Sequence, residues 1–403
     1  MKKINANIFV FVFCAIFVLY GIASPDFYSS LKDSITEAFE DKDAEDSTEQ
    51  DTADRLISSC ESVYSNNLTY HDLLMNIHSL EFRASDIPFV VKSDQTVIRL
   101  ENDYLTYKTE YHSDEKLEGA VKNIKDLNEY CSNLGIGFLY IKAPAKGEMV
   151  ETPASAFDYR ADDSQRLDGF LDEYGVSSIK LNQLMKEQGR TEEESFFATD
   201  HHWKPQTALW AVGEVCEELN RLYGFEYNDF YNDISNYNVE IYEDYFLGSA
   251  GKKVGLYFTK YGADDFPVIT PKFKTDFTME LPSNKVVKSG SFEDTLLFKE
   301  FLKKDYYNAN CYPFYSGGDF EIQIYDNKMI DDKKGDTFLV IRDSFACAFT
   351  PFLSLNADRV YAIDIRRTKR VESVREYIKE INPDYVLVLY NSSTLFAGQI
   401  EFN

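Results

Sequence analysis

The chain is short of basic residues. Its 403 residues include 42 Lys and Arg against 68 Asp and Glu, which gives a formal net charge of −26. Nucleic acids and anionic membrane surfaces both require clustered Lys and Arg, so neither is an expected partner. Hydrophobic residues still make up 44% of the chain and aromatic residues 15%, which is typical of a globular protein with a large core. The acidity favours solubility outside the cell.

Cysteine is scarce and follows no pattern. One of the six cysteines lies in an N-terminal apolar segment, and the other five are an odd number at irregular spacing: Cys60, Cys131, Cys216, Cys311 and Cys347. Such spacing is neither a disulfide framework nor a zinc-binding pattern. We therefore expect no metal and no cofactor, and we interpret Cys347 as a small core residue.

Only one apolar run approaches the length of a membrane segment. Lys2 and Lys3 precede an apolar segment that ends at Ala23. Its uninterrupted part, residues 8–20, has the length of a signal-peptide core, whereas counting from Ile4 gives about 20 residues, just enough to span a bilayer. With either a signal peptide or an anchor, the rest of the chain is translocated across the membrane. Residues 1–23 are therefore predicted to be a membrane anchor or a signal peptide, with the anchor favoured, and the protein is expected to be extracytoplasmic.

The remainder divides by composition into three parts. Residues 24–55 are crowded with Asp and Glu and are predicted to be an acidic spacer. Residues 56–112 are a mixed lead-in or cap region to which the sequence assigns no function. Residues 113–403 are the expected catalytic domain, with an aromatic-rich insertion at about 225–336.

Apolar strand patterns alternate with helical ones in this last part, which predicts an α/β fold with a parallel sheet covered on both faces. The expected strands are residues 136–143, 177–181, 338–341, 359–363 and 385–390. The expected helices are residues 117–134, 160–174, 205–223, 371–381 and one that begins at Phe345. Ligands of such sheets bind beyond the C-terminal ends of the strands.

Ser344 follows one of these strands directly. The run Phe338 to Ile341 is short and rich in β-branched residues, and Arg342-Asp343-Ser344 separates it from the next helical pattern. A serine at a strand-to-helix turn is exposed, and the free N–H groups of the helix can bind an oxyanion. Ser344 is therefore a candidate nucleophile, and a simple helix cap is the alternative.

A serine nucleophile needs a base, and the chain has only five histidines. Two of them lie in the run Thr199-Asp200-His201-His202-Trp203, just before a helix that starts at Pro205. Residues two apart in an extended segment point the same way, so Asp200 can face His202 and set its tautomer. His202 would then take the proton of Ser344. The alternative is a capping Asp beside a structural His.

The run Asp200-His201-His202-Trp203 resembles the signature of the DHHW proteins, and Ile341-Arg342-Asp343-Ser344-Phe345 resembles their serine block. That family is related to the SGNH hydrolase-like O-acyltransferases of bacterial exopolysaccharides, such as the alginate O-acetylation proteins. The resemblance runs from about Gly135 to the C-terminus and includes the motifs Ala143-Pro144-Ala145-Lys146, Phe246-Leu247-Gly248-Ser249, Gly317-Gly318-Asp319 and Val386 to Asn391.

The resemblance implies an SGNH hydrolase-like three-layer α/β/α fold of rearranged connectivity, because the Asp-x-His pair precedes the serine. It also implies a Ser344-His202-Asp200 triad in an O-acetyltransferase of a cell-surface polysaccharide. A membrane-bound acyltransferase that delivers the acetyl group is the implied partner.

The chain departs from the family pattern at two positions. Arg342 stands where SGNH enzymes often have Gly, and its side chain could narrow the pocket or bind a carboxylate or phosphate. Lys204 stands where relatives have a capping Thr. Neither departure affects the triad residues.

Four further residues have both a functional and a structural interpretation. Asn391 is a candidate second oxyanion donor or a turn residue. Lys146 is a candidate substrate contact, although a solvated loop lysine is favoured. Ser249 and Asp319 lie in Gly-containing motifs that either line the cleft or form hairpin turns, and the aromatic side chains of the insertion either stack on sugars or fill a core.

Three other functions stay open. An acetyl esterase would use the same triad without a sugar acceptor. A non-catalytic glycan-binding protein would keep the fold without the chemistry. A metal-dependent phosphoesterase is suggested by Asp200, His201 and His202, but it would need a second cluster of ligands that the sequence does not contain.

Overall fold

The computed structural model describes residues 71–92, 95–150, 156–330, 335–367, 373–392 and 402. The predicted anchor and acidic spacer lie outside these residues. The chain divides into two compact units, residues 1–81 and 82–403, and helix α4 (His71–Ala84) crosses the boundary. Across the described ranges, no helix combines the length and the apolar character needed to cross a membrane.

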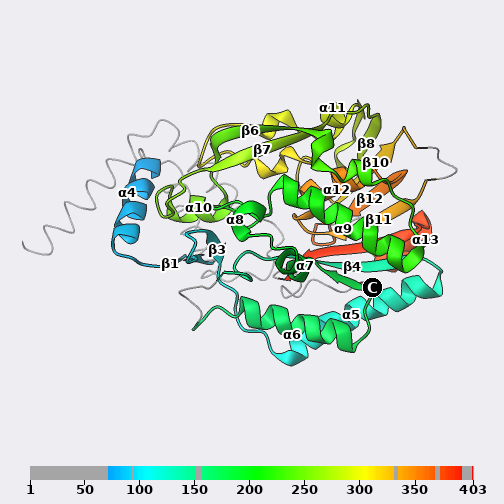
Figure 1. The fold of residues 1–403 in the computed structure, drawn as a ribbon, viewed down its shortest axis with the longest axis horizontal. Coiled ribbons are helices and arrows are strands. Elements are labelled where there is room, and N and C mark those ends of the chain that lie inside the picture. The colour runs from blue at the N-terminus through cyan, green and yellow to red at the C-terminus, as the bar shows by residue number, and fades with distance from the viewer. Residues whose placement is uncertain are drawn as a thin grey trace, which may run out of the picture. The chain divides into compact units, whose positions relative to one another are not determined.

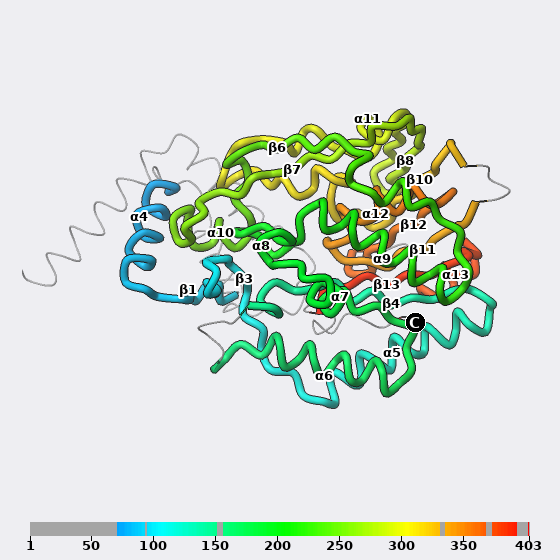
Figure 2. Tube along the Cα trace, viewed as in Figure 1, coloured from blue at the N-terminus to red at the C-terminus, as the bar shows by residue number. Residues whose placement is uncertain are grey.

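The larger unit is built on a sheet whose strand order is β5-β4-β13-β11-β12-β10-β8-β9. The first five run parallel, as predicted: β5 (Ser178–Lys180), β4 (Gly137–Ala143), β13 (Tyr385–Asn391), β11 (Thr337–Arg342) and β12 (Arg359–Ile363). The insertion extends this sheet with three antiparallel strands: β10 (Ile322–Asn327), β8 (Phe277–Leu281) and β9 (Val286–Gly290). Figure 2 shows β4 beside β13, so distant parts of the chain meet at the sheet centre.

Alternating side chains of the central strands bury both faces of the sheet. In β4, Phe138 and Tyr140 join one hydrophobic cluster, while Leu139 and Ile141 join the other. The first cluster is covered by α5 (Asp114–Asn133), α6 (Arg160–Glu173) and α13 (Val374–Ile381). The second is covered by α7 (Leu181–Glu187), α9 (Pro205–Tyr223) and α12 (Ala346–Leu353). Figure 1 shows α5 and α6 on one side and α9 and α12 on the other, which confirms the three-layer α/β/α fold.

Helix α9 has the bounds that its sequence predicts. Pro205 occupies its first turn, where no backbone N–H is needed, and Gly224 ends it with a left-handed φ of 74°. The helix therefore begins immediately after the Asp200 loop and fixes where that loop ends.

The lead-in region contributes a small antiparallel sheet to the larger unit, made of β1 (Phe89–Val91), β2 (Thr96–Arg99) and β3 (Leu105–Tyr107). The N–H of Leu105 donates to the carbonyl of Ala198 at 2.7 Å. This region, to which the sequence assigned no function, is thus joined to the segment that precedes Asp200. The short helix α8 (Glu192–Ser195) lies just upstream.

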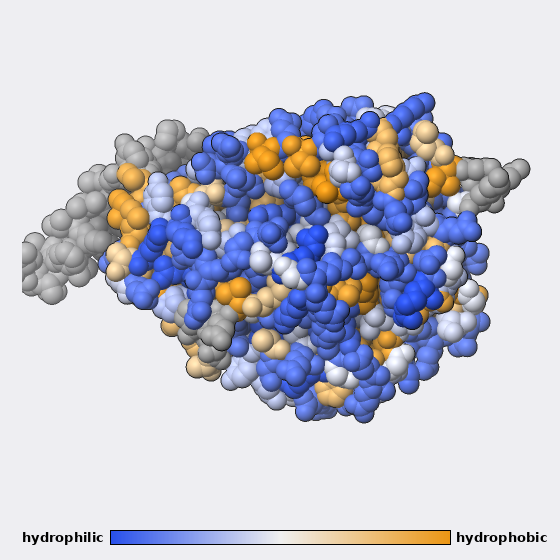
Figure 3. All heavy atoms as spheres, in the orientation of Figure 1, coloured by the Kyte–Doolittle hydropathy of each residue, from blue (hydrophilic) through white to orange (hydrophobic). Residues whose placement is uncertain are grey.

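The insertion also contains helices α10 (Ser249–Val254) and α11 (Phe292–Leu296) and a two-stranded ribbon of β6 (Tyr237–Phe246) and β7 (Asp264–Pro271). Half of its aromatic rings are buried in the core, among them Phe246, Phe266, Phe277, Phe292 and Tyr315. Figure 3 shows a largely hydrophilic face with apolar side chains gathered over β6 and β7, where Val239 and Ile241 are exposed.

Candidate active site

Ser344 lies in the turn between β11 and α12, at the C-terminal edge of the sheet. The carboxylate of Asp343 accepts the N–H of Phe345 at 2.9 Å and the N–H of Asn391 at 2.8 Å, which ties the turn to β13. Ser344 is partly exposed, whereas the residues on either side of it are buried. Ser344 is therefore partly exposed on a turn that these hydrogen bonds hold to β13.

Three side chains meet at this turn. His202 Nε2 lies 2.7 Å from the Oγ of Ser344, and His202 Nδ1 lies 2.5 Å from Oδ1 of Asp200. Hydrogen bonds thus join the hydroxyl of Ser344 to an imidazole and a carboxylate that come from a distant segment of the chain. If Nδ1 carries the proton, Nε2 is left as the acceptor that a serine base requires.

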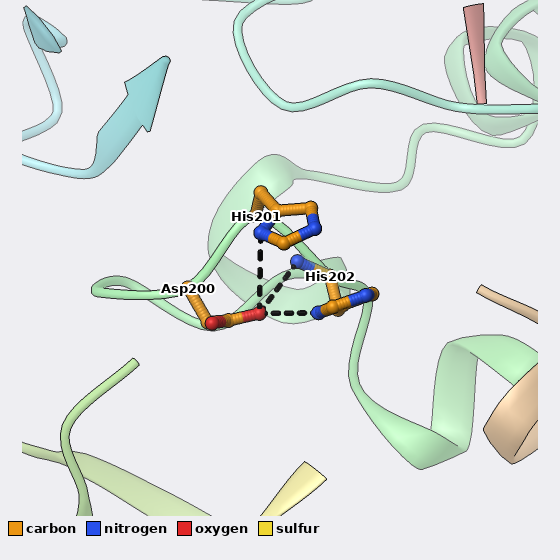
Figure 4. Close-up of side chains that lie close together, drawn as sticks. All are labelled: Asp200, His201 and His202. Carbon is orange, nitrogen blue, oxygen red and sulfur yellow. Dashed lines mark hydrogen bonds and ion pairs between the residues drawn. The ribbon is translucent and has the colours of Figure 1, made fainter. Parts of the chain in front are cut away.

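Asp200 is buried, and both of its carboxylate oxygens accept hydrogen bonds. Oδ1 also accepts the backbone N–H of His202 at 3.0 Å, and Oδ2 accepts the N–H of Ser249 at 2.7 Å. Burial raises the pKa of this carboxyl, but the two histidines and the N–H of Ser249 outweigh burial and hold the pKa well below its ordinary value. Figure 4 shows the carboxylate facing both imidazoles. Asp200 is therefore ionised at neutral pH.

Lys146 holds the Asp200 loop in place, which corrects the expectation of a solvated lysine. Its ammonium is buried and donates to the carbonyls of Phe197 at 2.7 Å, Ala198 at 3.1 Å and Asp200 at 2.5 Å. Burial lowers the pKa of Lys146 to about 8. The loop turns its carbonyls inward, and the lysine satisfies them, an arrangement that the sequence around Lys146 does not reveal.

Two further contacts fix the same loop. Asp264 of β7 accepts the N–H of Ala198 at 2.5 Å and both the N–H and the hydroxyl of Thr199. Gly248 lies so close that a Cβ there would be 2.3 Å from the Cβ of Asp200, so a larger residue would displace the carboxylate. The insertion therefore shapes the site, and nothing in the sequence around Asp264 marks this role.

An aromatic frame surrounds His202. Its ring stacks on Tyr312, with centroids 3.8 Å apart and an interplanar angle of 13°. The indole N–H of Trp203 donates to the carbonyl of Phe345 at 3.0 Å, which joins the histidine loop directly to the serine turn. The sequence did not predict a role for Tyr312, because the residues around it form no motif that indicates chemistry.

Arg342 does not face the site, contrary to expectation. Its side chain is completely buried, and its guanidinium bonds Asp319 at 2.7 Å, Gln323 at 2.6 Å and the carbonyl of Gly318 at 3.0 Å. Arg342 therefore neither narrows the pocket nor is available to an anion. Asp319, predicted to line the cleft, is its partner.

The other two predicted residues contact the Asp200 loop and the serine turn, respectively. Ser249 binds Asp200 through its N–H and lies 3.1 Å from Nδ1 of His201 through its hydroxyl. The side-chain amide of Asn391 donates to the carbonyl of Pro144 at 3.3 Å, at the end of β13.

Asp200, His201 and His202 also form a group with metal-ligand chemistry, because one ligand atom of each lies within 4.8 Å of the others. Both ring nitrogens of His202 are already bonded, to Asp200 and Ser344. No second group of this kind occurs in the described part of the chain, so a two-metal phosphoesterase site has no support there.

Comparisons with known proteins define the class. Residues 101–230, about a third of the chain, match the family model of the SGNH hydrolase-like domain of acetyltransferase AlgX. The fold and this match confirm an SGNH hydrolase-like domain and support an enzyme of the acyltransferase or esterase type. Comparison with curated protein sequences gives no match.

Solved structures share the fold. PatB1 of Bacillus cereus is 19% identical with a TM-score of 0.62 over 77% of this chain and 100% of that chain. PatB1 with a sulfonyl adduct gives the same TM-score at 18% identity. A DHHW family protein of Eubacterium siraeum is 18% identical, with a TM-score of 0.57 over 78% of this chain and 96% of that chain. The expected resemblance to DHHW proteins is thus confirmed at the level of fold.

Proposed function

We propose that this protein is an extracytoplasmic serine O-acetyltransferase that modifies a cell-surface polysaccharide. The single observation that carries the proposal is the unbroken hydrogen-bond chain from Asp200 through His202 to Ser344. The family match to an acetyltransferase domain favours acetyl transfer among the reactions that such a chain can perform.

The reaction follows from this geometry in two halves. Ser344 Oγ attacks the acetyl carbonyl of the donor while His202 Nε2 takes its proton, and His202 then protonates the leaving group as the acetyl-enzyme forms. A sugar hydroxyl next gives its proton to His202 and attacks the acetyl-enzyme, and Ser344 recovers its proton. The ionised Asp200 stabilises the imidazolium in both halves.

The negative oxygen of each tetrahedral intermediate needs donors. The proposed donors are the backbone N–H of Ser344, at the start of the turn into α12, and the side-chain amide of Asn391, at the adjacent strand end. Both lie at the C-terminal edge of parallel strands, where β11 and β13 run side by side.

The remaining parts of the proposal rest on the resemblance. An acetyl donor outside the cell requires a membrane-bound acyltransferase as partner. Residues 1–23 would bring the enzyme to the same membrane as an anchor, or export it as a signal peptide.

Substitution of Ser344 by Ala tests the proposal. We expect hydrolysis of 4-nitrophenyl acetate to fall by about a thousandfold or more, because Ser344 is the hydroxyl that His202 Nε2 contacts. Phenylmethylsulfonyl fluoride should modify Ser344 in the wild-type protein, as mass spectrometry of its peptides would detect. Hydrolysis that survives in Ser344→Ala, or that a chelator abolishes, would refute the triad.

An esterase is separated from a transferase by the acceptor. Adding a polysaccharide should divert acetyl groups from water to sugar, with acetylated glycan as the measured product. Hydrolysis that no glycan acceptor alters would favour the esterase.

A further inference from the structure

A cavity of about 280 Å³ lies beside the Asp200 loop, and His201, the neighbour of both Asp200 and His202, lines it. His201, Ser249 and Asn391 line it; His201 and Ser249 contact the catalytic residues, and the N–H of Asn391 binds Asp343, next to Ser344. The ring centroid of His201 lies 3.8 Å from that of His202, and the N–H of Ser249 binds Asp200. A molecule in this cavity would thus contact His201, whose ring packs on the catalytic imidazole of His202.

The opposite wall comes from the lead-in region. Thr106 to Thr109, at and after the end of β3, line the cavity, and the ring of Tyr107 lies 5.8 Å from that of His201. The small sheet therefore has a position that suits substrate binding.

The lining carries positive charge in a protein of net charge −26. Lys108, Lys146 and Arg160 all line the cavity, while none of its described lining residues is Asp or Glu. The other lining groups are mostly hydroxyls, amides and an imidazole. A cavity lined by one sign of charge attracts ligands of the opposite sign.

The partners of these cations are mainly neutral. Arg160 is buried and donates to the hydroxyl of Thr106 at 2.8 Å and to the carbonyls of Lys146 and Tyr107, with Asp158 at 3.6 Å. Its Nε has no hydrogen-bond partner among the described residues. Lys108 pairs with the exposed Glu110 at 2.7 Å, a pair that solvent screens. Lys146 donates to three carbonyls and has the carboxylates of Asp264 and Asp200 near it. The wall therefore keeps part of its positive charge mainly through Arg160 and Lys108.

His201 supplies a neutral group at the end nearest the triad. Burial and the neighbouring His202 lower the pKa of His201 below its ordinary value, so the ring is uncharged at neutral pH. Its Nδ1 lies 3.1 Å from the hydroxyl of Ser249, and its Nε2 has no partner within the described ranges.

We propose that this cavity is the acceptor subsite and binds a sugar unit that carries a negatively charged group. The inference rests on the proposed function. The cationic wall holds the charged group, and Nε2 of His201 bonds a hydroxyl of the same unit, which brings a neighbouring hydroxyl towards His202.

Calorimetric titration of the Ser344→Ala protein tests the charge preference without turnover. Trigalacturonic acid should bind at least about tenfold more tightly than a neutral galactose trisaccharide at low salt, and added NaCl should reduce the difference. Glucose 6-phosphate compared with glucose shows whether a phosphate replaces the carboxylate. Equal affinities for charged and neutral sugars, or no binding of any of them, would overturn the proposal.

Two variants in the same background locate the subsite. Lys108→Gln should weaken trigalacturonic acid binding by about fivefold, whereas Lys274→Gln, which removes the same charge at an exposed position outside the cavity, should not. His201→Ala should weaken binding by about fivefold, because it removes one hydrogen bond, and His78→Ala on the exposed face of α4 is its control. Equal effects of Lys108→Gln and Lys274→Gln, or unchanged affinity in His201→Ala, would contradict the assignment.

Failure of this inference can be told from failure of the proposed function. Ser344-dependent hydrolysis of 4-nitrophenyl acetate with no preference for acidic sugars would refute the subsite and leave the triad. A clear acidic preference with hydrolysis independent of Ser344 would support the subsite and refute the triad.

Discussion

At the scale of single residues, the proposed activity depends on one carboxylate, Asp200, that orients one imidazole, His202. Asp200→Asn would keep the shape but offer an amide in place of an anion, so His202 would lose both its tautomer preference and the charge that stabilises the imidazolium. We expect kcat for 4-nitrophenyl acetate to fall by about 10³ to 10⁴-fold, by analogy with serine proteases. The melting temperature, measured in parallel, should change by only a few degrees. A loss of less than tenfold would show that Asp200 is not the orienting group.

The lowered pKa of Lys146 predicts that the free energy of unfolding depends on pH. Its pKa is about 8 in the folded chain and 10.5 in an unfolded one, so the unfolded chain binds more protons between these values. The contribution of this group to stability therefore rises with pH across that window. Lys146→Met should be less stable at pH 7 by about 2 to 4 kcal/mol, because three carbonyls lose their donor.

The difference in unfolding free energy between the wild type and Lys146→Met should then grow by about 2 to 3 kcal/mol from pH 7 to pH 10. Comparing the two proteins at each pH cancels the titration of tyrosines and other lysines. Urea unfolding followed by fluorescence gives both values. A difference that does not change with pH would mean that Lys146 titrates normally.

At the scale of elements, the close approach of α10 to the Asp200 loop gives the next prediction. In Gly248→Ala the new Cβ would meet the backbone N and Cα of Asp200 at 2.5 Å, so one of the two segments must move. We expect a loss of about 2 to 4 kcal/mol in stability and at least a hundredfold loss in kcat. Gly213→Ala in α9 is a matched control, because its nearest neighbour would be 3.4 Å away. Wild-type activity in Gly248→Ala would show that α10 does not position Asp200.

The helices and strands also show which features of the fold the sequence could predict and which it could not. The periodicity of residues 205–223 and the apolar run at 338–341 located α9 and β11, because local hydrophobic pattern, proline and glycine decide such segments. The same reasoning could not show that β8, β9 and β10 extend the main sheet, because strand pairing depends on contacts between distant segments.

At the scale of the whole molecule, every residue assigned to the triad and the cavity lies in the unit of residues 82–403. A protein that begins at Phe82 should therefore fold and hydrolyse 4-nitrophenyl acetate with a kcat/KM within about threefold of the full chain, because each unit has its own internal contacts. Circular dichroism and initial rates test this expectation. A folded fragment without activity would place an essential group in residues 1–81.

By itself the sequence determined the fold class, the serine turn and the Asp200–His202 pair, because hydrophobic periodicity and the spacing of chemical groups are local properties of the chain. The tertiary structure alone decided that Lys146 and Arg342 are buried, that Tyr312 stacks on His202, and that β3 forms a wall beside His201. A charged side chain can face solvent or satisfy buried carbonyls and carboxylates, and only the packing of distant segments chooses between the two.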